Sequence, residues 1–435
     1  MTGRIGSKSK SPADGAAAAA GRRSPAVFVL LFLLVSGCAY VPLEPFGSER
    51  TARTLDPDER HLWKESRRLQ HEIEISGLLF EDEALDRYLA RVLERVSPPE
   101  LSTALVEPRV RVISDVNIHG YSFANGMIYI HTALLSRMAN ESQLATLLSR
   151  ELAHVIDRHA LRASRDKKAQ ADTLAWIGVG ASVVQGGGNY KLLAQAASIS
   201  SLAGFHYLLE TAADEKGLAI LAAAGYDVRE APKFFRMTID HLAEVHSQGV
   251  WGWAPFSPPV QMTARIAGYE KLIASQYGDS RATRRQPIAD PPAFQRKVHR
   301  ATLRQTELEL AAGLFVSAES SARRATESDP RDPEALVLFG RALVGQRSKP
   351  LPGRDLPSIR KVRAAFESAL QLDPRHAVAT RELGMSFYRK TGSTRGRKAT
   401  VEALRRFRRY LRIAPAAEDA DYVRGYIAEL EAESR

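Results

Sequence analysis

The sequence contains a single cysteine, Cys38, among 435 residues, which excludes an internal disulfide bond. Long hydrophobic runs are missing as well. The apolar run at residues 26–37, AVFVLLFLLVSG, is about a dozen residues long and too short to span a bilayer. No stretch has the pattern of a nucleic-acid-binding module. We therefore expect neither a disulfide framework nor a nucleic-acid partner.

The N-terminus has the pattern of a bacterial lipoprotein signal peptide. Residues 1–25 are small, polar and basic, and the apolar run that follows is typical of a signal-peptide core. The run ends in Val35-Ser36-Gly37-Cys38, which resembles a lipobox, the motif whose cysteine is acylated and becomes the mature N-terminus. We expect a signal peptide at 1–37, a tether at 38–54 and a membrane anchor through lipidated Cys38. An ordinary cleaved signal with a coincidental cysteine is the alternative, and a later start codon stays open.

Ala39 and Tyr40 follow the cysteine, without an aspartate of the inner-membrane retention type, so the pattern favours the periplasmic face of the outer membrane. The chain has a net charge of +11, and it would be +7 without residues 1–37. This excess favours attraction to anionic envelope surfaces or acidic partners. About 400 mature residues suggest two or three domains.

The segment 141–160, ESQLATLLSRELAHVIDRHA, is predicted to be an amphipathic helix with one face in a core. Its apolar positions recur at spacings of three and four: Leu144, Leu147, Leu148, Leu152, Val155 and Ile156. Within it, Arg150-Glu151-Leu152-Ala153-His154 has the spacing of the zinc motif H-E-x-x-H, but an arginine stands at the first histidine. Arginine offers no lone pair to a metal ion, and His159 would point about 140° away from His154 on a continuous helix. The plain alternative is that Glu151, His154 and His159 are ordinary polar residues of a buried helix.

Around this segment, helices are predicted at 57–78 and 82–96, and strands at 109–115 and 126–132. The later string Glu210-Thr211-Ala212-Ala213-Asp214 is a second signature. Together, the strand, the helix with Glu151 and His154, and this later E-x-x-A-D resemble the core of the CAAX-prenyl-protease family of zinc metallopeptidases. The resemblance covers most of residues 60–275 and implies a zincin-like metallopeptidase domain at 55–276.

In that family the later glutamate ligates zinc. The resemblance therefore implies that His154 and Glu210 are metal ligands, Glu151 is the general base and Asp214 orients a ligand. It also implies that the strand Met127-Ile128-Tyr129-Ile130-His131 is a sheet edge that takes an extended peptide by strand addition.

Two departures from the family lie in this region. Arg150 stands at the first histidine ligand, and Phe256-Ser257-Pro258-Pro259 lacks the histidine that related periplasmic members carry before a proline. A site with two ligands beside a fixed cation is expected to bind little or no zinc. Two outcomes stay open: His206, four residues before Glu210, could substitute as a ligand, or Arg150 could occupy the metal's place and pair with Glu151 or Glu210.

The C-terminal third has a loose internal repeat. Asp329-Pro330, Asp373-Pro374 and Ala414-Pro415 end successive predicted helix pairs at separations of 44 and 41 residues. The pattern resembles tetratricopeptide repeats at 298–435 after a linker at 277–297, with a plain helical bundle as the alternative. Residues 172–204 are expected to form a helical pair packed on the peptidase domain, or alternatively a membrane-dipping or lid element. The basic cluster at 389–412 is a solvated face, or it attracts acidic segments or anionic lipids.

We therefore expect a mainly α-helical protein with a small β-sheet: a zincin-like domain followed by an α-solenoid of tetratricopeptide-like repeats. The expected function is outer-membrane protein quality control or assembly by a peptidase-like protein with impaired or no zinc binding. It would bind unfolded or assembling envelope proteins as clients and hold partner proteins through the repeats. The alternative is an active zinc metalloendopeptidase that degrades misfolded or stalled envelope proteins.

Overall fold

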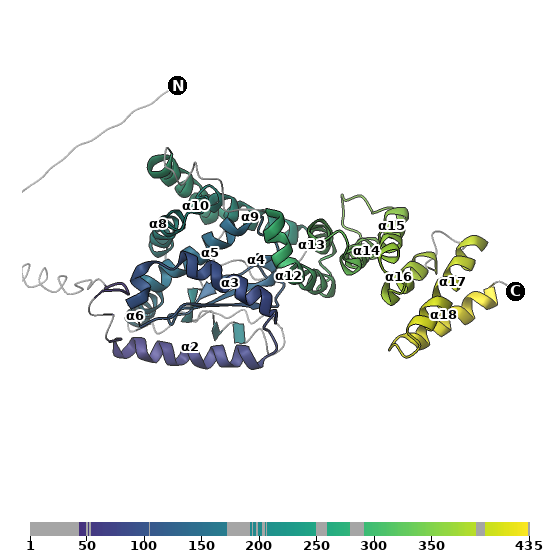
Figure 1. Cartoon of the computed structure of the whole chain (residues 1–435), viewed down its shortest axis with the longest axis horizontal. Coiled ribbons are helices and arrows are strands. Elements are labelled where there is room, and N and C mark those ends of the chain that lie inside the picture. Colours follow the sequence, from purple (N-terminus) through teal and green to yellow (C-terminus); the bar gives the residue numbers. More distant parts are fainter. Residues whose placement is uncertain are drawn as a thin grey trace, which may run out of the picture. The chain divides into compact units, whose positions relative to one another are not determined.

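The structure of the chain is a computed structural model (Figure 1). A three-stranded β-sheet lies at the centre of its N-terminal half. The strands are β1 (Arg109–Ile113), β2 (Gly120–Ser122) and β3 (Met127–His131), in the spatial order β1-β3-β2. Strand β3 runs parallel to β1, with Val110 opposite Ile128, and antiparallel to β2, with Tyr121 opposite Tyr129. Met127–His131 is therefore the middle strand, and the expectation that it forms a peptide-binding edge is wrong.

The structure describes residues 43–48, 51, 54–103, 105–171, 192–193, 195–196, 199–201, 205, 207–248, 259–278, 291–388 and 396–433. Cys38, His206, Phe256–Pro258 and most of 172–204 lie outside these residues, so the predictions for them stay predictions. All the described residues except Leu43 belong to one compact unit, Glu44–Arg435. Within the described residues, no helix combines the length and the apolar character needed to cross a membrane.

Helices cover both faces of the sheet. On one face, Leu69 and Ile73 of α2 (Pro57–Ile75) pack with Tyr121 and Tyr129 of the strands in a buried apolar cluster that Leu192 and Leu193 also join. On the other face lie α3 (Glu83–Val96) and α5 (Glu141–Ile156), as Figure 1 shows. The predicted helices 57–78 and 82–96 and strands 109–115 and 126–132 are thus confirmed to within a few residues.

The predicted helix 141–160 ends early, at Ile156, and a new helix, α6 (His159–Ala171), begins after a two-residue break. Arg158 in this break has φ 54°, the left-handed conformation that non-glycine residues rarely adopt. Its guanidinium is held there by ion pairs to Glu59 and, at 3.1 Å, to Asp56. Because neither glycine nor proline marks the break, the apolar pattern alone did not predict it.

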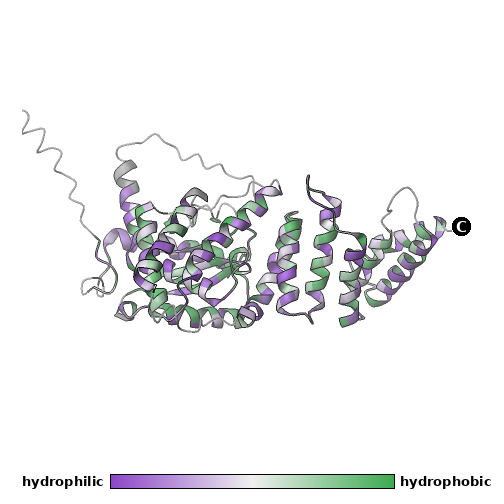
Figure 2. Ribbon diagram, turned by 90° about the horizontal axis from the view of Figure 1, so that it is seen from above, coloured by the Kyte–Doolittle hydropathy of each residue, from purple (hydrophilic) through white to green (hydrophobic). Residues whose placement is uncertain are grey.

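The remaining helices of this half are α4 (Thr132–Leu135), α8 (Tyr207–Ala223), α9 (Glu230–Ser247) and α10 (Pro259–Leu272), with the short η1 (Pro99–Thr103) and η3 (Ile273–Tyr277). The C-terminal helices are α12 (Pro291–Ala311), α13 (Phe315–Ser328), α14 (Pro333–Ser348), α15 (Ile359–Leu372), α16 (Ala377–Tyr388), α17 (Arg397–Ile413) and α18 (Ala420–Glu433). Residues 291–297, which were expected in a linker, form the first turns of α12. Figure 2 shows hydrophobic and hydrophilic residues on different sides of these helices.

Consecutive C-terminal helices pack against each other through a recurring contact. A Cβ on Gly340 of α14 would lie 2.4 Å from the ring of Phe366 in α15, and one on Gly384 of α16 would lie 2.8 Å from Phe407 in α17. In each case only glycine allows the aromatic ring of the next helix to approach so closely. The two contacts are separated by 44 positions at glycine and 41 at phenylalanine, the same separations as the proline motifs.

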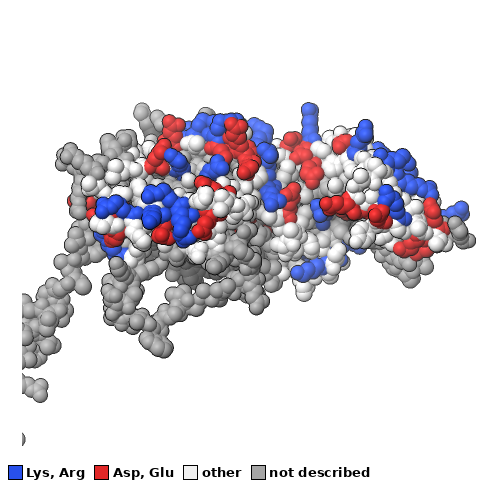
Figure 3. Space-filling model, turned by 90° about the horizontal axis from the view of Figure 1, so that it is seen from below, with Lys and Arg blue, Asp and Glu red and all other residues white. Residues whose placement is uncertain are grey.

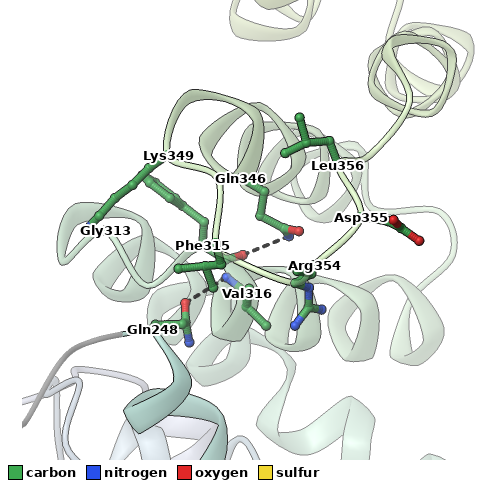
Figure 4. A pocket seen from close by; sticks show the side chains of 10 residues that line it. Gln248, Gly313, Phe315, Val316, Gln346, Lys349, Arg354, Asp355 and Leu356 are labelled. Atoms are coloured by element: carbon green, nitrogen blue, oxygen red, sulfur yellow. Dashed lines mark hydrogen bonds between the residues drawn. The ribbon is translucent and has the colours of Figure 1, made fainter.

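Buried polar contacts join α12 and α13 to the N-terminal half of the chain. Arg137 pairs with Glu309 of α12 at 2.7 Å, and Thr132 Oγ1 donates to Gln305 Oε1 at 2.9 Å. At the end of α9, Gln248 Oε1 accepts from the Val316 backbone N–H at 3.0 Å, beside a cavity of about 10 Å³ that has room for about one water molecule (Figure 4). These two helices are therefore anchored on the domain that carries the candidate site.

Candidate active-site cleft

Helices α5 and α8 cross where the two sequence signatures meet. Gly217 of α8 lies against α5, and a Cβ there would be 3.0 Å from the Cα of Arg150. Glu210, Asp214 and Gly217 follow one another at spacings of four and three, so they share the face of α8 that is turned toward α5. The glycine thus lets the backbones approach closely enough for two carboxylates of α8 to reach Arg150.

The guanidinium of Arg150 joins three carboxylates. Nη1 donates to Glu151 Oε1 at 2.8 Å, Nη2 donates to Glu210 Oε2, and Nε lies 3.3 Å from Asp214 Oδ1. The Arg150 side chain is 12% exposed, and those of its partners are at most 7% exposed. Both ion pairs considered for Arg150 from the sequence are therefore present, and Asp214 adds a third.

A second arginine closes the cluster from α10. Arg265 Nε donates to Asp214 Oδ2 at 2.7 Å, and its Nη1 lies 3.4 Å from Glu210 Oε2. Tyr269 donates its hydroxyl hydrogen to Asp214 Oδ1 at 2.9 Å. Asp214, expected to orient a ligand histidine, instead accepts from Arg265 and Tyr269. Neither of these residues was predicted, because nothing in their local sequence marks a partner 51 or 55 positions away.

Glu151 is fully buried, and both of its oxygens are engaged. Besides the Arg150 contact, Oε2 accepts from Ser122 Oγ and from Ser201 Oγ, each at 2.8 Å. Burial raises the pKa of the Glu151 carboxyl, although the Arg150 charge and the two serine hydroxyls oppose the shift. For Glu210, burial alone would raise the pKa, but the charges of Arg150 and Arg265 outweigh it and hold that pKa below its ordinary value.

His154 faces the same cluster with one nitrogen. Its Nδ1 lies 2.8 Å from His159 Nδ1, and its Nε2 lies 4.0 Å from Glu210 Oε1, without a hydrogen-bond partner among the described residues. Burial, followed by the charge of Arg150, lowers the pKa of His154 well below its ordinary value, and burial lowers the pKa of His159 to about 4. The break at Arg158 brings His159 here, so the expectation that it points away from His154 is wrong.

The described side chains do not fit a catalytic zinc ion. Only two candidate ligand atoms face each other among the described residues, His154 Nε2 and Glu210 Oε1, which lie 4.0 Å apart. Catalytic zinc sites usually have three protein ligands. The Arg150 guanidinium occupies the place where a third ligand would lie, and Arg265 brings a second positive charge close to Glu210. Among the described residues, no group of three or more His, Cys, Asp or Glu side chains is placed to hold a metal ion.

A small cavity of about 90 Å³ opens beside the cluster, with Arg150, Glu210 and Arg265 among its polar walls. Its apolar walls come from the loop before β2 and from α4, α5, α9 and α10: Ile118, Leu134, Leu147, Phe234, Phe235 and Met262. The cavity is large enough for a short side chain.

The free side of β2 is partly covered, since the Ser122 N–H donates to Ser201 Oγ at 2.8 Å and Phe123 forms an antiparallel bridge with Ser200.

The sheet, the crossed helices and the paired signatures agree with the metallopeptidase domain expected from the sequence. Comparison with known proteins agrees: residues 83–301, half of the chain, match the model of peptidase family M48. The chain therefore belongs to peptidase family M48, and the metallopeptidase family expected from the sequence is confirmed. The expected mainly helical fold with a small sheet is confirmed as well.

Curated relatives carry related names. The beta-barrel assembly-enhancing protease of Escherichia coli (strain K12) is 31% identical over 136 residues, which are 30% of this chain and 28% of that protein. The putative beta-barrel assembly-enhancing protease of Vibrio cholerae is 26% identical over 242 residues, 54% of this chain and 46% of that protein. The mitochondrial metalloendopeptidase OMA1 of Arabidopsis thaliana is 24% identical over 159 residues, 36% of this chain and 31% of that protein. The chain thus spans less than half the length of these relatives.

Proposed function

We propose that this protein is a bacterial envelope quality-control factor with a peptidase fold that binds its clients and has lost zinc-dependent cleavage. The observation that carries the proposal is the Arg150 guanidinium, which pairs with the general-base candidate Glu151 and with the ligand candidate Glu210. A cation in this place repels a divalent metal ion and pairs with the Glu210 carboxylate that would otherwise bind the metal ion. Without a metal, a bound water keeps too high a pKa for Glu151 to activate it.

The proposed clients are unfolded or assembling envelope proteins. The Escherichia coli and Vibrio cholerae relatives are named beta-barrel assembly-enhancing protease, the second as putative, and this supports a role in the assembly or quality control of such proteins. Because β3 lies inside the sheet, strand addition at Met127–His131 forms no part of the proposal. The cavity beside Arg150 and Arg265 is the better candidate for client contact.

The C-terminal helices are proposed to be tetratricopeptide-like repeats that hold protein partners. The recurring glycine–phenylalanine contact between successive helices, at Gly340 with Phe366 and at Gly384 with Phe407, supports a repeated unit. Lipidation of Cys38 is proposed to anchor the protein at the periplasmic face of the outer membrane. The apolar run followed by Val35-Ser36-Gly37-Cys38 supports this anchor.

Zinc content tests the loss of metal chemistry. The protein from residue 39 onward, which keeps the whole compact unit, is purified beside Arg150→His and Arg150→Lys variants, and zinc is counted by elemental analysis. We expect wild type and Arg150→Lys to be metal-free and Arg150→His to take up about one zinc per chain, as a restored third ligand predicts. In the Arg150→His background, Glu151→Gln should keep the zinc and lose any cleavage of an unfolded protein. Stoichiometric zinc in the wild type would refute the proposal.

An active zinc endopeptidase is the second candidate. The observation that favours it is His154 Nε2, which is buried, faces Glu210 and has no hydrogen-bond partner among the described residues. On this account, His206 supplies the missing ligand. If the wild type binds zinc and cleaves protein, and His206→Ala loses both properties while folding normally, this candidate replaces the first.

A further inference from the structure

Helix α17 buries one face and exposes a row of cations on the other. Its buried face, Thr400, Ala403, Phe407 and Tyr410, includes three members of an apolar cluster that Val423 and Leu430 of α18 join. The opposite face is exposed and consists of six residues: Arg397, Lys398, Val401, Arg405, Arg408 and Arg412. Five of these six side chains are cationic. From Lys398 onward the exposed positions recur at spacings of three and four, so the six residues form one stripe along the helix, which we call the α17 stripe.

Few carboxylates balance the stripe. Arg405 pairs with Glu402 at 2.8 Å and Arg408 with Glu431 at 2.7 Å; in both pairs the arginine is exposed and the glutamate is partly exposed. Such pairs are weak in water and exchange readily for other anions. Arg397, Lys398 and Arg412 have no ion pair among the described residues. The whole helix carries seven basic residues and one acidic residue, and Figure 3 shows basic side chains gathered over the C-terminal helices on the face it draws.

Neighbouring like charges on one helix face destabilise the helix, as Arg405, Arg408 and Arg412 do at spacings of three and four. A face that only needs to be soluble would mix charges of both signs, as α18 does with Arg424 beside Asp421. Four of the five cations of the stripe are arginine, whose planar guanidinium binds phosphate oxygens with two parallel hydrogen bonds. The stripe therefore fits a surface with many phosphate groups.

The stripe lacks the apolar anchors of a protein interface. Val401 is its only apolar member, at 58% exposed, whereas specific protein interfaces are centred on buried aromatic or large apolar side chains. Adsorption to an anionic lipid surface needs no such anchor, since each cation near the surface contributes separately. We propose that the α17 stripe docks on a membrane surface that carries anionic phosphate headgroups. This contact does not depend on the state of the cleft at Arg150.

Vesicle binding tests the proposal. The protein from residue 39 onward, which keeps the compact unit Glu44–Arg435 and lacks Cys38, is sedimented with vesicles of phosphatidylglycerol and phosphatidylcholine, and with vesicles of phosphatidylcholine alone. We expect binding to the anionic vesicles only, weakening as salt rises. The variant Arg405→Gln/Arg408→Gln/Arg412→Gln should bind these vesicles on the order of 100-fold more weakly, at about fivefold for each cation removed.

A matched control removes three exposed cations elsewhere, as Lys64→Gln/Arg67→Gln/Arg331→Gln. It lowers the net charge equally and should bind anionic vesicles nearly as well as wild type. Thermal melting checks that both variants fold. Equal losses in the two variants, or equal binding of wild type to both vesicle types, would overturn the proposal. Binding of wild type to polyglutamate but not to anionic vesicles would overturn it in favour of an acidic protein partner.

Discussion

Replacement of Arg150 by methionine removes the central cation and leaves buried carboxylates on Glu151, Glu210 and Asp214. Removing one partner of a buried ion pair typically costs 3 to 5 kcal/mol, because the remaining charge is left in a place of low polarity. Arg265 still faces Glu210 and Asp214, so we expect the lower end, about 3 kcal/mol. For a domain of about 200 residues, such as 55–276, a loss of about 3 kcal/mol lowers the melting temperature by about 6 to 12 °C.

Differential scanning calorimetry of the chain from residue 39 measures the effect. Arg67→Met, at an exposed position of α2, is the control and should change stability by less than about 0.5 kcal/mol. The double variant Arg150→Met/Glu210→Gln should be more stable than the sum of its single variants predicts, because it removes a charge with its partner. Additive effects, or an Arg150→Met melting temperature within about 2 °C of wild type, would show that the network is not held by its charges.

The loss of stability in Arg150→Met should depend on pH, and the direction of this dependence follows from the pKa of Glu210. Arg150 and Arg265 lower the pKa of Glu210 against the effect of burial. The stability from this lowered pKa is present above the ordinary glutamate pKa of about 4.3 and is lost as the pH falls through the lowered value. The difference in melting temperature between wild type and Arg150→Met should therefore narrow below about pH 4.

Two further predictions concern a buried histidine and a helix contact. Burial lowers the pKa of His119 to about 3, so the native state resists its protonation, and stability should fall as the pH drops below about 6.5, where the unfolded chain takes up the proton. His119→Gln should reduce the slope of the melting profile between pH 7 and 5, to which the buried His154 and His159 also contribute, and an unchanged slope would contradict the prediction. Gly340→Ala should destabilise the C-terminal helices by about 1 to 3 kcal/mol, because its Cβ would meet the Phe366 ring at 2.4 Å. Gly425→Ala, with no atom within 4 Å of the new Cβ, should leave them unchanged or slightly more stable, and equal effects of the two substitutions would contradict this account.

Features with a local pattern could be predicted from the sequence. The helices α2 and α3 and the strands β1 and β3 follow from spacing and composition, and the two signatures placed Glu151 and Glu210 in one cleft. Strand β2 was missed, because three residues in a stretch rich in Asn, Gly and Ser carry no alternation to detect. Strand β3 was placed at the wrong position in the sheet, since strand order depends on pairings distant in sequence.

Only part of the charge network could be predicted, for a similar reason. Arg150 next to Glu151 was visible in the sequence, whereas Arg265 and Tyr269 reach Asp214 only after α10 packs beside α8. His159 was excluded by the geometry of a continuous helix, which the left-handed Arg158 interrupts. Long-range packing and one strained residue therefore decide which polar groups meet in the cleft.

The cation at the centre of the cleft is part of the polypeptide. A bound metal ion, by contrast, can be removed by a chelator, and acidic ligands are then left without their counter-ion. Arg150 cannot dissociate, and its three carboxylate partners raise the pKa of its guanidinium against the effect of burial, so it stays charged throughout the physiological range. If the proposed loss of zinc binding is correct, the integrity of this cleft is fixed when the chain is synthesised and does not follow the supply of metal in the surroundings.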